Sequence, residues 1–66
     1  MLTTLELERR KQGLTQSQLR DKALVGLNTI VSLEKGNIDG VRVKTLKKIA
    51  KALDTTVVEL FFSEEE

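Results

Sequence analysis

The apolar residues between positions 43 and 53 recur at intervals of three and four, and this spacing constrains the fold more than any other feature of the sequence. They are Val43, Leu46, Ile49, Ala50 and Leu53. Residues at this spacing lie on one face of an α-helix, whereas a half-buried strand would alternate every second residue. The segment therefore predicts an amphipathic helix whose apolar side needs a partner surface to pack on.

Capping signals divide the rest of the chain into further short helices. A Thr with Glu or Gln three residues later can satisfy two backbone N–H groups at a helix start. This pattern occurs at Thr3–Glu6, Thr15–Gln18 and Thr56–Glu59, which predicts helices over about residues 3–12, 15–23 and 56–61. Apolar residues at helical spacing predict another helix from 27 to 35, ended by a glycine, with loop chemistry at 37–40. We therefore expect an all-α fold with five helices.

The size and composition of the chain exclude several classes of protein. Its 66 residues suffice for one small domain. Because Cys and His are both absent, disulfides, thiolate or imidazole metal sites and Cys or His catalysis are excluded. We expect no enzyme, and we predict no cofactor, metal or small-molecule ligand. No apolar run approaches the roughly 18 residues of a membrane span, so we expect no membrane association and a cytoplasmic location.

Charge is distributed unevenly along the chain. All eleven Lys and Arg residues lie within residues 1–53, together with five of the ten Asp and Glu residues. The other five acidic residues lie in 54–66. The positive part suits a polyanionic partner, although solvated helix faces with a solubilising tail explain the same pattern. We interpret the lysines of segment 43–53 as a solvated face, except for Lys44, which we expect to contact phosphate.

The segment from Leu14 to Gly36 has the outline of a helix-turn-helix, two short helices joined by a tight turn. Its sequence resembles the Cro/C1-type helix-turn-helix (XRE) family of phage and bacterial repressors. The resemblance is carried by Leu14-Thr15-Gln16-Ser17-Gln18-Leu19, Val25, Thr29-Ile30, Leu33-Glu34-Lys35-Gly36, the segment 45–53 and Glu59-Leu60-Phe61. It implies a compact five-helix, repressor-like domain over residues 1–62, with the motif at about 15–34 and an acidic tail at 63–66.

The resemblance also implies a double-stranded DNA partner and roles for single residues. The third helix would enter the major groove, and the residues expected to face base edges are Leu27, Asn28, Val31 and Ser32. The residues expected to contact phosphate are Gln16, Ser17, Asn37, Arg42 and Lys44. Arg9 and Glu34 match an internal ion pair. An Asn side chain has a donor beside an acceptor and can bind adenine in a bidentate manner, while a helix N-terminus binds phosphate through free N–H groups.

Three positions depart from the pattern of the family. Arg20 stands where a small residue is usual, and we expect its charged head to project into solvent past the contact between the two helices. Leu24 stands where Gly is usual, and we expect it to cap the core from the turn. Leu27 replaces a polar residue. Together with Val31 it could read thymine methyl groups, or it could mark a DNA surface that has been weakened or put to another use.

Phe61 and Phe62 are the only aromatic residues, and one side of a short helix cannot bury both. Phe61 is expected in the core. Phe62 is then either an ordinary exposed residue or the seam of an isologous homodimer, which we favour. The sequence thus predicts a transcriptional regulator, a repressor, that acts as a homodimer on a palindromic operator. The alternative is a helical protein-binding module, antitoxin-like or an anti-regulator, that uses Leu27, Val31 and Phe62 as apolar contacts.

Overall fold

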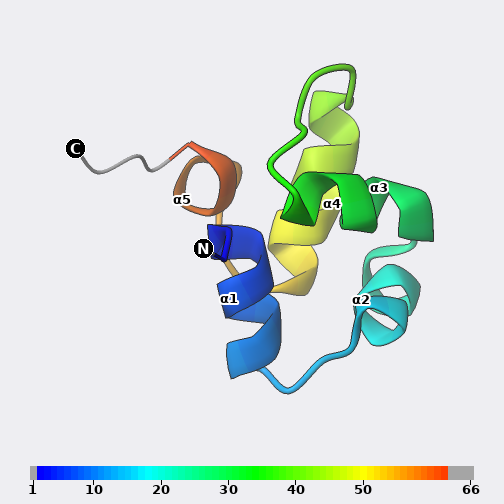
Figure 1. Cartoon of the computed structure of the whole chain (residues 1–66), viewed down its shortest axis with the longest axis vertical. Coiled ribbons are helices and arrows are strands. Elements are labelled where there is room, and N and C mark those ends of the chain that lie inside the picture. The colour runs from blue at the N-terminus through cyan, green and yellow to red at the C-terminus, as the bar shows by residue number, and fades with distance from the viewer. Residues whose placement is uncertain (1, 63–66) are drawn as a thin grey trace.

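The computed structural model describes residues 2–62, which form five helices and no strand (Figure 1). The helices are α1 (Thr4–Lys11), α2 (Gln16–Ala23), α3 (Leu27–Glu34), α4 (Val43–Ala52) and α5 (Val57–Phe61). The prediction of an all-α, five-helix fold is confirmed, and the helix limits differ from the sequence prediction by only one or two residues. The acidic tail predicted at 63–66 lies outside the described residues.

The helices begin at the predicted capping residues. At the start of α2 the capping box is complete, because Thr15 Oγ1 accepts from the Gln18 backbone N–H and Gln18 Oε1 accepts from that of Thr15. At the start of α1, Thr3 Oγ1 accepts from the Glu6 N–H at 3.2 Å. The predicted capping box at Thr3 and Glu6 is not completed by the Glu6 side chain. Its carboxylate instead accepts a hydrogen bond from Arg10 Nη2 at 2.6 Å, one turn further along the helix.

The core contains eleven buried apolar side chains contributed by all five helices. They are Leu5, Leu19, Ala23, Ile30, Leu33, Leu46, Ile49, Ala50, Ala52, Leu53 and Leu60. The apolar stripe of α4 is buried as its spacing predicts, except at its first residue. Val43 is 60% exposed because it begins the helix, beyond the edge of the packed surface.

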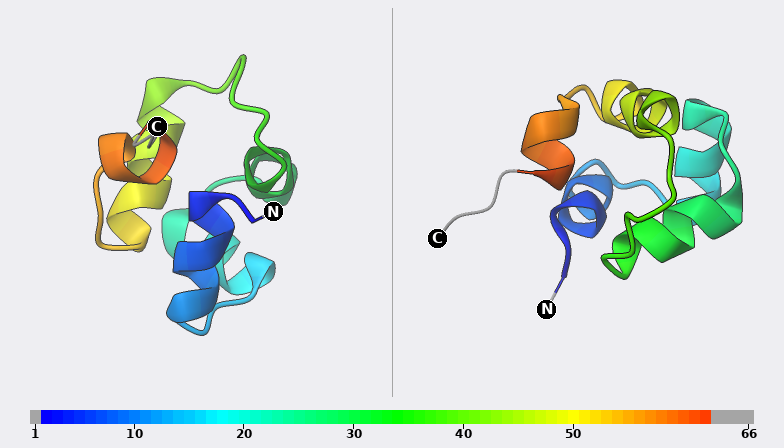
Figure 2. Two further views of the ribbon diagram at one scale, coloured as in Figure 1. Left: turned by 60° about the vertical axis from the view of Figure 1, so that its left-hand side comes forward. Right: turned by 90° about the horizontal axis from the view of Figure 1, so that it is seen from above.

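Helix α2 packs against both α3 and α4, whereas α1 packs against α3 and α5. Seen from above in Figure 2, α3 and α4 therefore lie on opposite sides of the domain, with α2 beside both. Helix α3 ends at Glu34, and after its C-cap Lys35 the chain turns at Gly36, whose φ of +91° suits glycine. The N–H of Gly36 donates to Leu33 and that of Asn37 to Ser32, so two terminal carbonyl groups of α3 are satisfied. The arrangement leaves one side of α3 open to solvent.

Candidate nucleic-acid interface

Helix α3 has an inner side that builds the core and an outer side that solvent can reach. Ile30, Leu33 and Glu34 on its inner side are buried. The residues predicted to read bases are accessible: Asn28 is exposed, and Leu27, Val31 and Ser32 are half-buried. The Asn28 amide makes no hydrogen bond with another residue of the described part, 2–62, so its donor and its acceptor are both available.

The start of α2 presents free backbone donors next to this surface. Within residues 2–62, the backbone N–H groups of Gln16 and Ser17 have no hydrogen-bond partner, because the capping box engages only the neighbouring N–H groups of Thr15 and Gln18. Ser17 is exposed and Gln16 is half-buried. Free N–H groups together with the positive end of the helix dipole form an anion-binding site.

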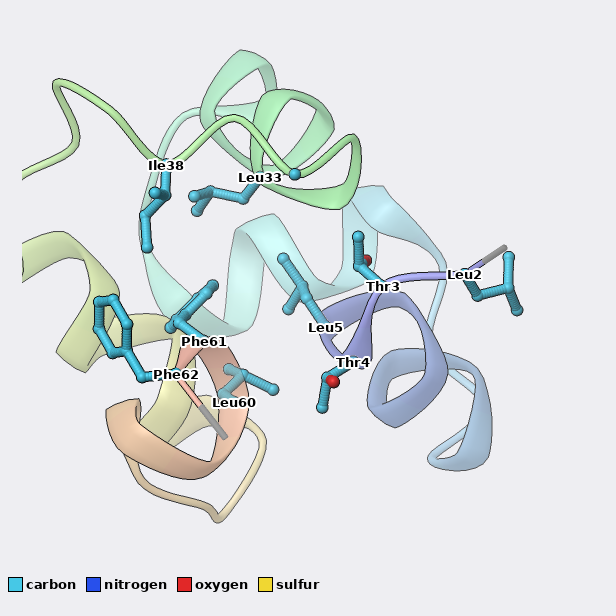
Figure 3. A pocket seen from close by; sticks show the side chains of 10 residues that line it. Leu2, Thr3, Thr4, Leu5, Leu33, Ile38, Leu60, Phe61 and Phe62 are labelled. Carbon is cyan, nitrogen blue, oxygen red and sulfur yellow. The ribbon is translucent and has the colours of Figure 1, made fainter. Parts of the chain in front are cut away.

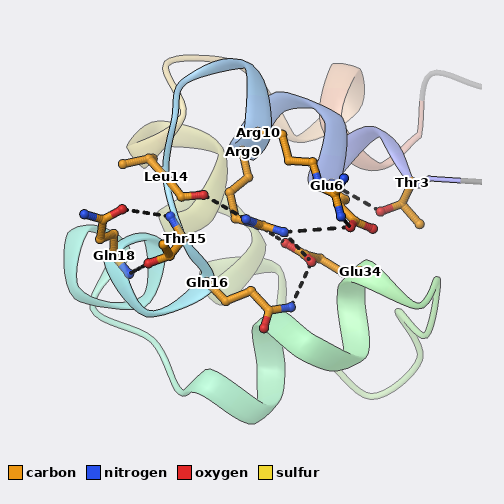
Figure 4. A network of polar contacts seen from close by, with 9 residues as sticks. All are labelled: Thr3, Glu6, Arg9, Arg10, Leu14, Thr15, Gln16, Gln18 and Glu34. Atoms are coloured by element: carbon orange, nitrogen blue, oxygen red, sulfur yellow. Dashed lines mark hydrogen bonds and ion pairs between the residues drawn. The ribbon is translucent and has the colours of Figure 1, made fainter.

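A buried ion pair ties α1 to the end of α3 (Figure 4). Arg9 Nε donates to Glu34 Oε2 at 2.6 Å and Arg9 Nη2 donates to Glu34 Oε1 at 3.2 Å, so the contact is bidentate. The third guanidinium nitrogen, Nη1, donates to the backbone carbonyl of Leu14 at 2.8 Å. One side chain therefore connects three segments: α1, the loop before α2, and α3.

The same carboxylate also holds the side chain at the start of α2. Gln16 Nε2 donates to Glu34 Oε1 at 2.9 Å, although the two residues are 18 positions apart. Figure 4 shows Arg9 and Gln16 approaching Glu34 from different helices. The hydrogen bond to Glu34 raises the pKa of Arg9, and this outweighs the opposing effect of burial. Arg9 therefore remains protonated near neutrality, and the hydrogen bond from Gln16 to Glu34 orients the first residue of α2 relative to α3.

The turn between the two motif helices corrects one expectation from the sequence. Leu24 does not cap the core, since its side chain is 78% exposed. Its backbone adopts a left-handed conformation, with φ +59° and ψ +49°, which directs the side chain outward while the N–H still donates to the Arg20 carbonyl. A left-handed conformation costs a non-glycine residue roughly 1–2 kcal/mol. The turn thus keeps the geometry of a glycine turn without a glycine.

Arg20 does not separate the motif helices. Leu19 and Ala23 of α2 are buried in the same core as Ile30 of α3. The Arg20 guanidinium lies at the surface, where its Nε donates to the exposed Asp21 carboxylate at 3.1 Å. The charged head therefore reaches past the helix contact, as expected for a long side chain with an apolar stem.

The loop after α3 and the first turn of α4 contribute three exposed polar residues, Asn37, Arg42 and Lys44. Arg42 is the N-cap of α4, and Lys44 lies in the first turn of that helix. Their side chains make no hydrogen bond or ion pair with other residues in the described range. These groups are available to a ligand, whereas Asp39 in the same loop adds one negative charge.

A second surface feature lies on the α1 and α5 side of the domain, where a pocket of about 560 Å³ opens (Figure 3). Leu33 and Ile38 line it from one side, and Phe61 and Phe62 line it from α5. Phe61 is half-buried against the core, as predicted. Phe62 is 54% exposed at the rim. The pocket is predominantly apolar in its lining and lies apart from the outer side of α3.

Sequence reasoning missed the hydrogen bond between Gln16 and Glu34, because it considered Gln16 only as a ligand contact. No local sequence pattern predicts a contact between residues 18 positions apart. The link from Gln12 Nε2 to the Leu53 carbonyl, at 2.8 Å, was missed for the same reason.

Two further observations concern residues 2–62. No group of three or more acidic, Cys or His side chains in this range could hold a metal ion. No helix in the same range is both long and apolar enough to cross a bilayer.

Comparison with known proteins agrees with the geometry. The family model described as Helix-turn-helix matches residues 5–60, which include all the buried side chains of the core and the whole two-helix motif. No curated protein and no solved structure matches the chain. The two motif helices, the accessible outer side of α3 and the extent of the match lead to one conclusion: the chain belongs to the Cro/C1-type helix-turn-helix family of DNA-binding transcription regulators.

Proposed function

We propose that the protein is a repressor that binds a palindromic operator as a homodimer. The single observation that carries the proposal is the position of Asn28. Its unpaired amide is exposed in the first turn of α3, and the Arg9–Glu34 pair holds the other end of this helix against α1. Asn in the major groove reads adenine through its N6 and N7 positions. Ser32 adds a hydroxyl, and Leu27 with Val31 offers apolar contact to thymine methyl groups.

Phosphate contacts set the register of α3 in the groove. In this proposal they come from the start of α2, from the loop after α3 and from the first turn of α4, through Gln16, Ser17, Asn37, Arg42 and Lys44. Gln16 uses one N–H of its amide for Glu34, and an amide group carries a second N–H that remains available for a phosphate oxygen. The free backbone N–H groups of Gln16 and Ser17 support the same role.

The homodimer forms in this proposal through Phe62. Its exposed ring beside an apolar pocket supports a two-fold seam in which each copy covers the pocket of the other. A two-fold protein requires two half-sites one helical turn apart, and binding there would exclude a polymerase from an overlapping promoter. The DNA-binding domain would comprise residues 1–62, followed by the acidic tail at 63–66.

The experiment is selection from a randomised duplex pool at about 50 and 200 mM salt, with sequencing of the retained duplexes. We expect an enriched sequence with two-fold symmetry and binding that weakens steeply with salt. A symmetric sequence spaced by one helical turn supports the dimer, whereas a single unrepeated half-site contradicts it. Enrichment should disappear for Asn28→Ala.

A second candidate function is supported by three accessible apolar side chains of the motif, since Leu24 is 78% exposed and Leu27 and Val31 are half-buried, and a shared apolar patch suits a protein partner. In this alternative the domain is a protein-binding module that contacts its partner through Leu24, Leu27 and Val31. If the selection experiment retains DNA only weakly, with no dependence on salt and no enriched sequence, the result favours the protein-binding module over the repressor.

A further inference from the structure

The basic side chains of α1 and those of α4 differ in how they are paired. On α1, Arg9 pairs with Glu34, Arg10 pairs with Glu6, and Lys11 pairs with Glu8 at 3.2 Å. On α4, no Asp or Glu of the described residues lies within ion-pair distance of any lysine. We call these exposed residues the lysine stripe: Lys44, Lys47, Lys48 and Lys51. The stripe is the largest group of unpaired charge within residues 2–62.

The lysine stripe faces away from α3. The buried residues of α4 include Leu46 and Ile49, which share one core with Ile30 and Leu33 of α3. The lysines lie on the opposite side of the helix from these residues. Because α3 and α4 lie on opposite sides of the domain (Figure 2), a duplex bound to the outer side of α3 leaves Lys47, Lys48 and Lys51 uncovered.

We propose that Lys47, Lys48 and Lys51 of the lysine stripe bind the phosphate backbone of a second nucleic acid duplex, without sequence preference, while α3 holds the first and Lys44 contacts that first duplex. From Lys47 to Lys51 these side chains span about 6 Å at 1.5 Å per residue. One strand of B-DNA presents a phosphate about every 3.4 Å along its axis, so about two phosphates face them. This inference takes from the proposed function only the binding of the first duplex by α3.

The composition of the stripe favours a phosphate backbone over a protein partner. Lysine is depleted in the centres of protein interfaces, where aromatic side chains and Arg are enriched. No aromatic side chain lies among the four lysines, since both aromatic residues of the chain are on the α5 side. Asp54 lines the same hollow at the end of α4 as Lys47 and Lys51, and its negative charge ends the positive surface of the stripe there. The consequence is a protein that bridges two DNA segments.

The test is a capture experiment with the full chain. A random 30-base-pair duplex is immobilised, the protein is added, and capture of a labelled random duplex is measured between about 50 and 200 mM salt. The variant is Lys47→Ala/Lys51→Ala. The matched control is Arg10→Ala/Lys11→Ala, which removes the same charge from exposed positions that are paired with Glu6 and Glu8. Circular dichroism establishes that both variants are folded.

We expect the α4 variant to retain the first duplex and to capture the second at least about tenfold less well. The slope of log affinity for the second duplex against log salt concentration should decrease in magnitude by about 1.8, because two phosphate contacts are lost. The control should capture like the unmodified protein. Equal capture by both variants, or equal loss, overturns the proposal. Tighter binding of a labelled acidic peptide than of the second duplex, abolished by the same α4 variant, overturns it in favour of a protein partner.

The outcome separates this inference from the proposed function. Retention of the first duplex without capture of the second rejects the lysine stripe alone. Capture that survives Asn28→Ala, with no sequence enriched in the selection experiment, rejects the operator-binding role of α3 alone. No salt-sensitive retention of either duplex rejects both.

Discussion

The two ends of α3 are held in very different ways. At its C-terminal end, Glu34 is buried, receives three hydrogen bonds from Arg9 and Gln16, and is followed by a glycine turn that satisfies the last carbonyl groups. At its N-terminal end, Gly26 offers no side-chain cap, and Leu24 just before it adopts a left-handed conformation. Polar contacts therefore anchor α3 at its C-terminal end, whereas its N-terminal end has no side-chain cap.

The difference has a physical basis. Buried charges need fixed partners, because an unpaired buried carboxylate is costly. Groups that recognise a ligand must instead keep their donors and acceptors free, as Asn28 does. Substitutions at the anchored end and at the free end therefore test whether the two ends contribute separately to stability and to recognition.

The largest effect is expected at the anchored end. Arg9→Ala leaves Glu34 buried without its main partner, so it should lower the free energy of unfolding by about 3–5 kcal/mol, measured by urea unfolding. Arg10→Ala removes only an exposed i,i+4 pair and should cost less than about 1 kcal/mol. The double variant Arg9→Met/Glu34→Leu should recover much of the loss, since no charge is then buried alone. Similar losses for Arg9→Ala and Arg10→Ala would contradict the assigned role of the pair.

A smaller effect, on recognition rather than stability, is expected at the free end. Asn28→Ala should weaken binding to the selected duplex by about 1–3 kcal/mol and leave binding to random DNA nearly unchanged. Its free energy of unfolding should stay within about 0.5 kcal/mol of the unmodified protein, because the side chain is exposed. Fluorescence anisotropy with both duplexes measures the difference. Equal losses on both duplexes would mean that Asn28 does not read a base.

The turn before α3 should gain stability from a glycine. Leu24→Gly relieves the left-handed strain and removes an exposed apolar side chain, so we expect stabilisation of about 1 kcal/mol after the entropy of glycine in the unfolded chain is included. Asp54, the other non-glycine residue with positive φ among residues 2–62, provides a comparison. Asp tolerates this conformation better than Leu, so Asp54→Gly should gain less. A destabilised Leu24→Gly variant would show that the Leu24 side chain contributes packing.

The smallest effect concerns the missing cap. Gly26→Ser should stabilise α3 by a few tenths of a kcal/mol, because a Ser hydroxyl accepts from an N–H of the first turn. The new Cβ would lie 3.7 Å from Thr29 Oγ1, which is an ordinary contact. Thermal unfolding should show a small upward shift of Tm. A fall in Tm would indicate that the start of α3 follows a different path from the one described.

Most of the fold could be predicted from the sequence, and part of the candidate site could be as well. The capping residues Thr15 and Thr56 and the glycine after α3 act within a few residues of where they stand, so a local pattern suffices to locate each helix. The resemblance to the family also supplied the Arg9–Glu34 pair, which the structure contains. The exposed position of Leu24 could not be predicted, because it depends on how the backbone of the turn places the side chain relative to two helices.

The number, limits and inward sides of the helices follow from the amino-acid sequence, since helix formation depends on contacts between residues three and four apart. The tertiary structure brings together groups from different helices. It placed Gln16 on Glu34, Gln12 on the Leu53 carbonyl, and Phe62 beside an open pocket. Among residues 2–62, it also left the lysines of α4 without acidic partners. These outcomes depend on the angles and distances at which helices pack, and those arise from the shape of the whole core.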